Sequence, residues 1–243
     1  MESLYKCIWM SAGVLNFRLC DREFDCERCQ IDQALRKGTP HPTGLASAAE
    51  SVRSETATFR TSGRNFYHPC HLWVRIGLGG VVRVGLDAIA SSLLKPLREV
   101  RLPLPGADVQ QGQNAWTFIG DSGRCELPSP IAGKILSRNE NLLLRPETIH
   151  EGSRREVWLA RIRPSRLSED LESLTYGRRV SEWLGSELEK IRGHLVRAHA
   201  LSMGSIPDGG NISPSVLDGI DPSLRRALVE EMLLNPAQRQ KGR

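Results

Sequence analysis

The feature that most constrains the fold of this 243-residue chain is a series of short apolar runs between residues 65 and 172. Each run has the length of a β-strand, and turns rich in glycine or proline, such as Gly77–Gly80, separate them. One helix is expected among them, over Asp87–Leu94, because its apolar residues share a helical face. This region is therefore predicted to be mainly β. The predicted strands are Leu72–Ile76, Val81–Val84, Val100–Leu104, Thr117–Ile119, Ile131–Leu136 and Val157–Ile162.

Composition divides the chain into four predicted parts. Residues 1–36 are rich in cysteine, whereas residues 37–64 are rich in glycine, proline, serine, threonine and alanine, which is typical of a linker. Residues 65–172 form the predicted β-domain and residues 173–243 a helical extension. Apolar residues around Trp183 recur every three or four positions and predict a long amphipathic helix. A second helix is predicted over Leu224–Leu234, with Asp221 as its N-cap and Pro222 at its first position.

The cysteine-rich part is predicted to be a small metal-binding unit. The runs Lys6–Met10 and Val14–Cys20 predict a hairpin, and a short helical pattern over Ile31–Arg36 follows Cys26–Cys29. Thiolates at the end of a hairpin strand and at the start of a helix can converge tetrahedrally on one ion. We expect zinc, and an iron–sulfur cluster or a reactive dithiol are the alternatives. The four predicted ligands are Cys7, Cys20, Cys26 and Cys29.

Five blocks of the β-domain resemble the H proteins of glycine cleavage, in family order and at family spacing. The first block, Tyr67–Arg75, reads YHPCHLWVR and resembles the family's opening motif. The resemblance implies a barrel-sandwich hybrid of two small antiparallel sheets, which in this family carries lipoate on one lysine at the tip of an exposed hairpin. The other blocks are Val82–Asp87, Val100–Gly106, Leu127–Gly133 and Trp158–Ser165.

The resemblance fails at the attachment point. The tip reads Gly120-Asp121-Ser122-Gly123, so Ser122 stands where the family has its lysine, and no lysine lies between Pro96 and Gly133. A guanidinium stays protonated and is a poor acyl acceptor, so the neighbouring arginines are no substitute. A serine hydroxyl would form only a labile ester on a shorter stem. We therefore expect no covalent lipoate.

These observations predict a non-catalytic adaptor: an H-protein-like domain that docks on a partner enzyme. The expected partner is an oxidoreductase or a lipoyl-type enzyme complex, with the amphipathic C-terminal helices as candidate contact surfaces. One alternative is a redox or electron-transfer component that carries an iron–sulfur or dithiol centre. Another is a divergent glycine cleavage H protein that carries an aminomethyl group. No catalytic triad or phosphate-binding loop is present that would predict an enzyme.

Charge and hydropathy exclude other classes of function. The 33 basic and 28 acidic residues give a net charge of +5, which is too small an excess to predict nucleic-acid binding. No apolar run approaches the roughly 20 residues that span a bilayer, so no membrane segment is expected. The N-terminal stretch is a poor match to a secretion signal, and a cytoplasmic location is expected.

Overall fold

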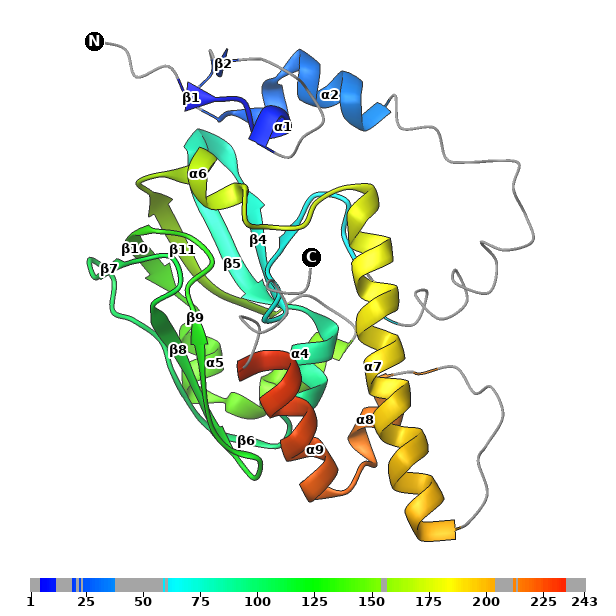
Figure 1. Cartoon of the computed structure of the whole chain (residues 1–243). Helices are drawn as coiled ribbons and strands as arrows, with labels where there is room; N and C mark the ends of the chain where they lie inside the picture. Colours follow the sequence, from blue (N-terminus) through cyan, green and yellow to red (C-terminus); the bar gives the residue numbers. More distant parts are fainter. Residues whose placement is uncertain are drawn as a thin grey trace, which may run out of the picture.

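Two antiparallel sheets form the centre of the molecule in the computed structural model (Figure 1). The described residues are 5–11, 19–20, 22, 24–37, 59, 61–153, 157–203, 212 and 214–234. One sheet has six strands in the order β3-β4-β5-β11-β10-β7, and the other has three in the order β6-β8-β9. The first comprises β3 (Phe66–Tyr67), β4 (Leu72–Ile76), β5 (Val82–Leu86), β7 (Asp108–Val109), β10 (Gly133–Arg138) and β11 (Val157–Pro164). The second comprises β6 (Leu97–Arg101), β8 (Asn114–Gly120) and β9 (Gly123–Pro128).

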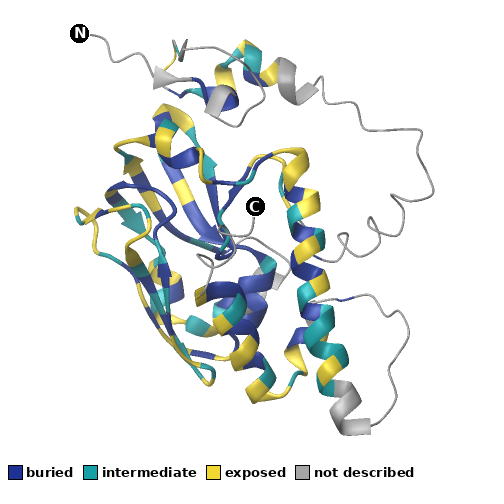
Figure 2. Ribbon diagram, in the orientation of Figure 1, coloured by how far each residue is buried: buried dark blue, intermediate teal, exposed yellow. Residues whose placement is uncertain are grey.

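Alternation of side chains along the strands builds the core. Alternate residues of the strands point to the same face, so one face of each sheet is apolar and packs inward. On β5 the inward residues are Val82, Val84 and Leu86, all fully buried, whereas Arg83 between them is exposed (Figure 2). On β8, Trp116 and Phe118 are buried in the same way. The prediction of antiparallel β structure between residues 65 and 172 is confirmed, although the chain as a whole mixes α and β.

Several strand boundaries differ from the prediction for identifiable reasons. β5 continues to Leu86, because Gly85 lets the Trp73 ring lie where a side chain would stand: a Cβ there would be 2.3 Å from that ring. β6 ends at Arg101, before the predicted end, because the prolines at 103 and 105 cannot donate ladder hydrogen bonds. The short strands β3 and β7 and the strand β9 were not among the predicted runs.

Helices flank the sheets, and two of them begin as predicted. Asp87 caps α4 by accepting a hydrogen bond from the Ala90 amide at 2.9 Å. Asp221 caps α9 in the same way, accepting a hydrogen bond from the Ser223 amide at 2.8 Å. The last five residues of this predicted helix, Glu230–Leu234, form a π-helix, η4. No described helix is long and apolar enough to cross a membrane. The helical elements of this region are α4 (Ala88–Leu93), α5 (Glu140–Leu144), α6 (Leu167–Leu171), α7 (Arg178–Met203), α8 (Pro214–Asp218), α9 (Pro222–Val229), η2 (Leu78–Gly80), η3 (Pro146–Ser153) and η4 (Glu230–Leu234).

The cysteine-rich part lies against the β-domain near α6 (Figure 1). Its strands β1 (Tyr5–Lys6) and β2 (Leu19–Cys20) pair as an antiparallel hairpin, but the predicted strand stops at Lys6 because α1 (Ile8–Ser11) follows. The helical turn directs Trp9 inward. Its indole donates to Asp32 at 2.9 Å, and its ring meets the Tyr176 ring edge-on at 5.2 Å. This part also contains η1 (Cys26–Arg28) and α2 (Gln30–Lys37), and most of the predicted linker lies outside the described residues.

A buried histidine joins α7 to the β-domain. The His71 ring is fully buried, with Nδ1 2.8 Å from Asp87 and Nε2 3.5 Å from Glu187 of α7. Burial alone lowers the pKa of His71, but Asp87 and then Glu187 outweigh it and raise the pKa to about 9. Burial and the charge of His71 in turn lower the pKa of His68 to about 4. A charged imidazolium between two carboxylates therefore connects β4, α4 and α7.

The C-terminal helices use their apolar faces inside the molecule. Leu217 of α8, Leu228 of α9 and Met232 of η4 are fully buried. The Arg225 guanidinium, itself buried, donates to the Ser92 carbonyl of α4 at 2.8 Å and to the Leu217 carbonyl at 2.5 Å. The expectation that the apolar faces of these helices contact a partner is therefore wrong for Leu217, Leu228 and Met232, because packing on α4 and β9 has already buried them. Val216 of α8 and Leu234 of η4 stay exposed.

Replacing His71 with asparagine should destabilise the fold and remove a pH dependence. Asparagine tolerates the positive φ of 60° at this position, so the effect reports the lost charge. Asp87 loses its cationic partner, and Glu187 keeps only its pair with Lys190 at 2.7 Å, so the free energy of unfolding should fall by about 3 kcal/mol.

The raised pKa of His71 sets the pH range. In the wild type, the contribution of His71 is fully present below pH 6.5 and is lost as the pH rises through about 9. Urea unfolding at several pH values checks both effects. Glu187→Gln serves as the comparison that keeps the histidine, and an unchanged slope between pH 6.5 and 9 in His71→Asn would contradict the assignment.

Candidate functional site

The candidate site is the tip of the hairpin that joins β8 to β9. Gly120 pairs with Gly123 across the two strands, so Asp121 and Ser122 form a two-residue loop. Gly123 has a φ of 99°, a left-handed conformation that glycine adopts without strain. The geometry of the turn is therefore sufficient to explain Gly123. The functional groups of the tip come from the loop residues Asp121 and Ser122.

The tip is held against the start of β6. The Arg98 guanidinium donates two hydrogen bonds to one carboxylate oxygen of Asp121, at 2.9 and 2.7 Å. The Asp121 amide lies 3.4 Å from the Pro96 carbonyl. A Cβ at Gly120 would lie 2.2 Å from that same carbonyl oxygen, so glycine is required for the approach. Both partners of the ion pair are exposed, so the backbone contact contributes more to the position of the tip than the pair does.

Ser122, predicted to match the attachment lysine, has a half-buried side chain. Its Oγ is buried and has no hydrogen-bond partner among the described residues. Among the described side chains, no histidine or carboxylate is hydrogen-bonded to it to act as a base, and a serine hydroxyl without a base is a weak nucleophile. The tip thus offers a small hydroxyl and an ion-paired carboxylate, neither of which is an acyl acceptor comparable to an amine.

One lysine does lie beside the tip in space, which the sequence pattern did not predict. Leu97 pairs with Gly120, so Lys95 is two residues from the strand position opposite the tip. Its ammonium group is almost completely buried and lies 3.1 Å from Asp218 of α8. No local sequence signal connects residues 95 and 218, so only the fold reveals this pair. Lys95 therefore stabilises the contact with α8 and does not present its amine to solvent.

A shallow depression of about 320 Å³ lies at the end of the three-stranded sheet away from the tip. Its walls come from β6, β7 and β8 and carry both charged and amide side chains. The depression reaches β8 as far as Thr117, whereas the tip begins at Gly120, so the two features involve different residues of this strand. The lining residues are Arg101, Leu102, Pro103, Asp108, Val109, Gln113, Asn114, Ala115 and Thr117.

Comparison with known proteins identifies the family. A model of the glycine cleavage H-protein family matches residues 65–187, more than half of the chain. The chain belongs to the glycine cleavage H-protein family. The probable glycine cleavage system H protein of Pyrococcus furiosus is 30% identical over 130 residues, which cover 54% of this chain and 96% of that relative. The glycine cleavage system H protein of a Synechococcus species is 38% identical over 104 residues, covering 42% and 81%.

A solved structure also resembles the chain. It is the crystal structure of a glycine cleavage system H protein from Mycobacterium marinum, with 25% identity and a TM-score of 0.43. The match covers 52% of this chain and 98% of the Mycobacterium marinum chain. The H-protein match ends at Glu187, within α7, so the cysteine-rich part and the helices α8 and α9 lie outside it.

The structure brings the four N-terminal cysteines close to one another. Cys20 on β2 pairs with Tyr5, and Cys7 directly follows β1. Cys26 begins η1 and Cys29 is its C-cap, and the charges of Cys7, Cys20 and Cys29 all act on Cys26. Burial raises the pKa of the Cys26 thiol far above its usual range. The negative charges of Asp32 and of the other three cysteines raise it further. The Phe24 amide also donates to Cys20 Sγ at 3.2 Å.

The four cysteines do not form a recognisable metal site in this structure. Within the described ranges, no group of three or more histidine, cysteine, aspartate or glutamate side chains is placed so that it could hold a metal ion. The donor types and their proximity fit zinc, whereas their coordination geometry in this structure does not. Metal ligation by Cys7, Cys20, Cys26 and Cys29 stays a prediction.

Substitution of Gly120 should show how firmly the tip is held. In Gly120→Ala, the added Cβ would overlap the Pro96 carbonyl, so we expect a loss of about 1–3 kcal/mol in the free energy of unfolding. Gly185→Ala is the matched control. It lies within α7 with no atom within 4 Å of the new Cβ, and alanine should stabilise that helix by about 0.5–1 kcal/mol. Thermal unfolding of both variants measures the difference, and equal behaviour would contradict the close contact at the tip.

Proposed function

We propose that this H-protein family member is a non-catalytic adaptor that docks on a partner enzyme without covalent lipoate. The observation that carries the proposal is the chemistry of the hairpin tip. Ser122 replaces an amine with a hydroxyl, and the neighbouring Asp121 is ion-paired to Arg98. A swinging arm needs a long and mobile anchor, whereas this tip is short and held against β6.

Family membership taken alone favours the second candidate, a divergent H protein that carries an aminomethyl group. The relatives in Pyrococcus furiosus and Synechococcus are named as glycine cleavage system H proteins. In that case another amine near the tip would have to accept lipoate. Lys95 is the lysine next to the strand that pairs with the tip, and its burial against Asp218 keeps its amine from solvent.

Intact mass spectrometry separates these two candidates. The full chain is produced together with a lipoate ligase and lipoate, with the Pyrococcus furiosus relative treated in parallel as the positive control. We expect no lipoyl increment on the wild-type chain, because no exposed amine lies at the tip. The variant Ser122→Lys supplies that amine and tests whether the tip itself is accessible to the ligase. A lipoyl increment on the wild type, at Lys95 or elsewhere, would establish the carrier and end the adaptor proposal.

We also propose that the cysteine-rich part binds zinc through Cys7, Cys20, Cys26 and Cys29. The support is the proximity of Cys7, Cys20 and Cys29 to the buried Cys26, whose pKa burial and then these neighbours raise. A divalent cation would stabilise the thiolates that this surrounding disfavours. When bound, zinc would supply structural stability to a unit with little core of its own. An iron–sulfur cluster or a reactive dithiol at the same residues would instead favour the redox alternative, in which the chain serves an oxidoreductase complex.

Metal analysis of the purified chain decides among these cofactors. We expect stoichiometric zinc and no visible absorbance in an anaerobic preparation. The metal should be lost in Cys26→Ser/Cys29→Ser and retained in the control Cys70→Ala/Cys125→Ala, which removes two buried thiols outside the unit. Iron with labile sulfide would support the redox alternative. Retention of zinc in the first variant would show that these cysteines are not the ligands.

A further inference from the structure

A row of three arginines crosses the outer face of the six-stranded sheet. Arg75 on β4 lies directly opposite Arg83 on β5, and Arg83 lies directly opposite Arg161 on β11. Direct neighbours on antiparallel strands have Cβ atoms about 5 Å apart. The three residues therefore occupy a strip about 10 Å wide, measured from the first strand to the third.

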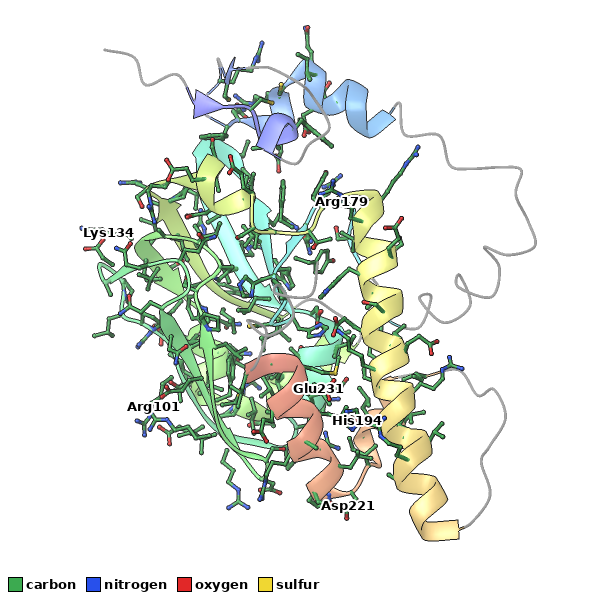
Figure 3. All side chains as sticks on the ribbon, in the orientation of Figure 1. Arg101, Lys134, Arg179, His194, Asp221 and Glu231 are labelled. Atoms are coloured by element: carbon green, nitrogen blue, oxygen red, sulfur yellow. The ribbon has the colours of Figure 1, made fainter. Side chains whose placement is uncertain are left out.

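Further cations extend this row in both directions. Arg163 lies two residues beyond Arg161, on the same face of β11, and its neighbour on β10 is Lys134. At the other border, Arg178 and Arg179 are exposed in the first turn of α7. Figure 3 shows Lys134 at β10 and Arg179 at the start of α7, on either side of β4 and β5. We name Arg75, Arg83, Arg161 and Arg163 the arginine face.

This concentration of positive charge is unfavourable for the folded chain by itself. Like charges opposite one another on neighbouring strands destabilise a sheet, and cations in the first turn of a helix oppose its dipole. In the part of the chain that the structure describes, Arg83, Arg161 and Arg163 form no ion pair, and the first turn of α7 contains no acidic residue. The arrangement contrasts with the three-stranded sheet, where Arg98, Arg101 and Arg124 each pair with a carboxylate.

Contacts beneath the arginine face hold two of its guanidinium groups in place. The Arg75 guanidinium lies 5.3 Å from the centre of the Trp73 ring, and its Nε donates to Asn65 at 2.8 Å. The Arg83 guanidinium lies 5.9 Å from the centre of the Trp158 ring. Such contacts reduce the conformational freedom that an arginine would lose on binding, so the groups are partly arranged for a ligand before it arrives.

We propose that the arginine face is the docking surface for a carboxylate-rich segment of a partner protein. The planar guanidinium group matches a carboxylate through two parallel hydrogen bonds, and several guanidinium groups in a row match a segment with several acidic side chains. A bound acidic segment would also neutralise the repulsion between the opposed arginines. The inference rests on the proposed adaptor role and assigns to it a surface and the chemistry of its partner.

The same face is poorly suited to single-stranded nucleic acid. Proteins that bind single strands combine positive charge with exposed aromatic rings on which the bases stack. Here Trp73 is buried beneath the start of α7, and Arg83 lies over the ring of Trp158. The face therefore offers charge and directional hydrogen bonds without a stacking platform, which favours an acidic polypeptide.

Binding of an acidic peptide to the full chain tests the proposal. The probe is a fluorescein-labelled peptide of alternating glutamate and glycine, and fluorescence anisotropy measures its affinity at low salt and at about 0.15 M. We expect Arg83→Gln/Arg161→Gln to weaken binding by about tenfold or more. The matched control, Arg101→Gln/Arg124→Gln, removes the same charge from outward strand positions of the other sheet (Figure 3 labels Arg101) and should weaken binding by less than about twofold.

Thermal unfolding of the same variants distinguishes docking from a purely structural role, because the two roles predict opposite changes in melting temperature. Because Arg83 lies between two other arginines, Arg83→Gln/Arg161→Gln should melt at a higher temperature than the wild type while losing the peptide. A lower melting temperature would assign these arginines to stability and overturn the proposal.

Two further outcomes would also overturn it. Equal loss of affinity in both double variants would mean that the peptide senses net charge alone. Tighter binding of a single-stranded DNA oligonucleotide, lost in Arg83→Gln/Arg161→Gln, would make the face a nucleic-acid site. None of these measurements depends on lipoylation, so a failure here is distinct from a failure of the mass experiment.

Discussion

The His71 imidazolium, held between Asp87 and Glu187, is the interaction on which the arrangement of the larger elements depends. It is the point at which β4, the cap of α4 and the middle of α7 meet in a region from which water is excluded. A buried charge of this kind is tolerated only when its partners are in place, so each of the three elements is required by the other two. Asp87 has two partners: its Oδ1 accepts a hydrogen bond from the Ala90 amide and caps α4, while its Oδ2 lies against the His71 ring.

The position of α7 in turn determines what the outer face of the six-stranded sheet exposes. Its first turns cover Tyr67 and Trp73 with Val180 and Trp183, and the arginine row begins beside this contact, with Arg75 over the Trp73 ring. The hairpin tip lies on the other sheet, next to the buried pair of Lys95 and Asp218. The hairpin tip and the arginine face therefore belong to different sheets.

Local patterns in the sequence predicted much of the fold, and long-range contacts account for what they missed. The Asp221 cap and the start of the helix at Asp87 were predictable, because both depend on residues within one helical turn. The end of β6 was not, because the apolar residues Leu102 and Leu104 continue the strand pattern on either side of Pro103. The α1 turn was also missed, since Ile8 and Trp9 suit a strand and become helical where Trp9 reaches Asp32 and Tyr176. At the site, the tip residues were predictable, whereas the burial of Lys95 by a residue 123 positions away was not.

The C-terminal helices have a consequence for how this family member can be dissected. The family match stops at Glu187, yet Leu217, Leu228 and Met232 complete the core around α4 and β9. A fragment cut at the family boundary would expose this apolar surface, leave the Lys95 ammonium without its carboxylate and remove Arg225 from the Ser92 carbonyl. The limits of the family match and of the packed folding unit therefore differ, because the helices after residue 187 complete the core of the domain that they cover.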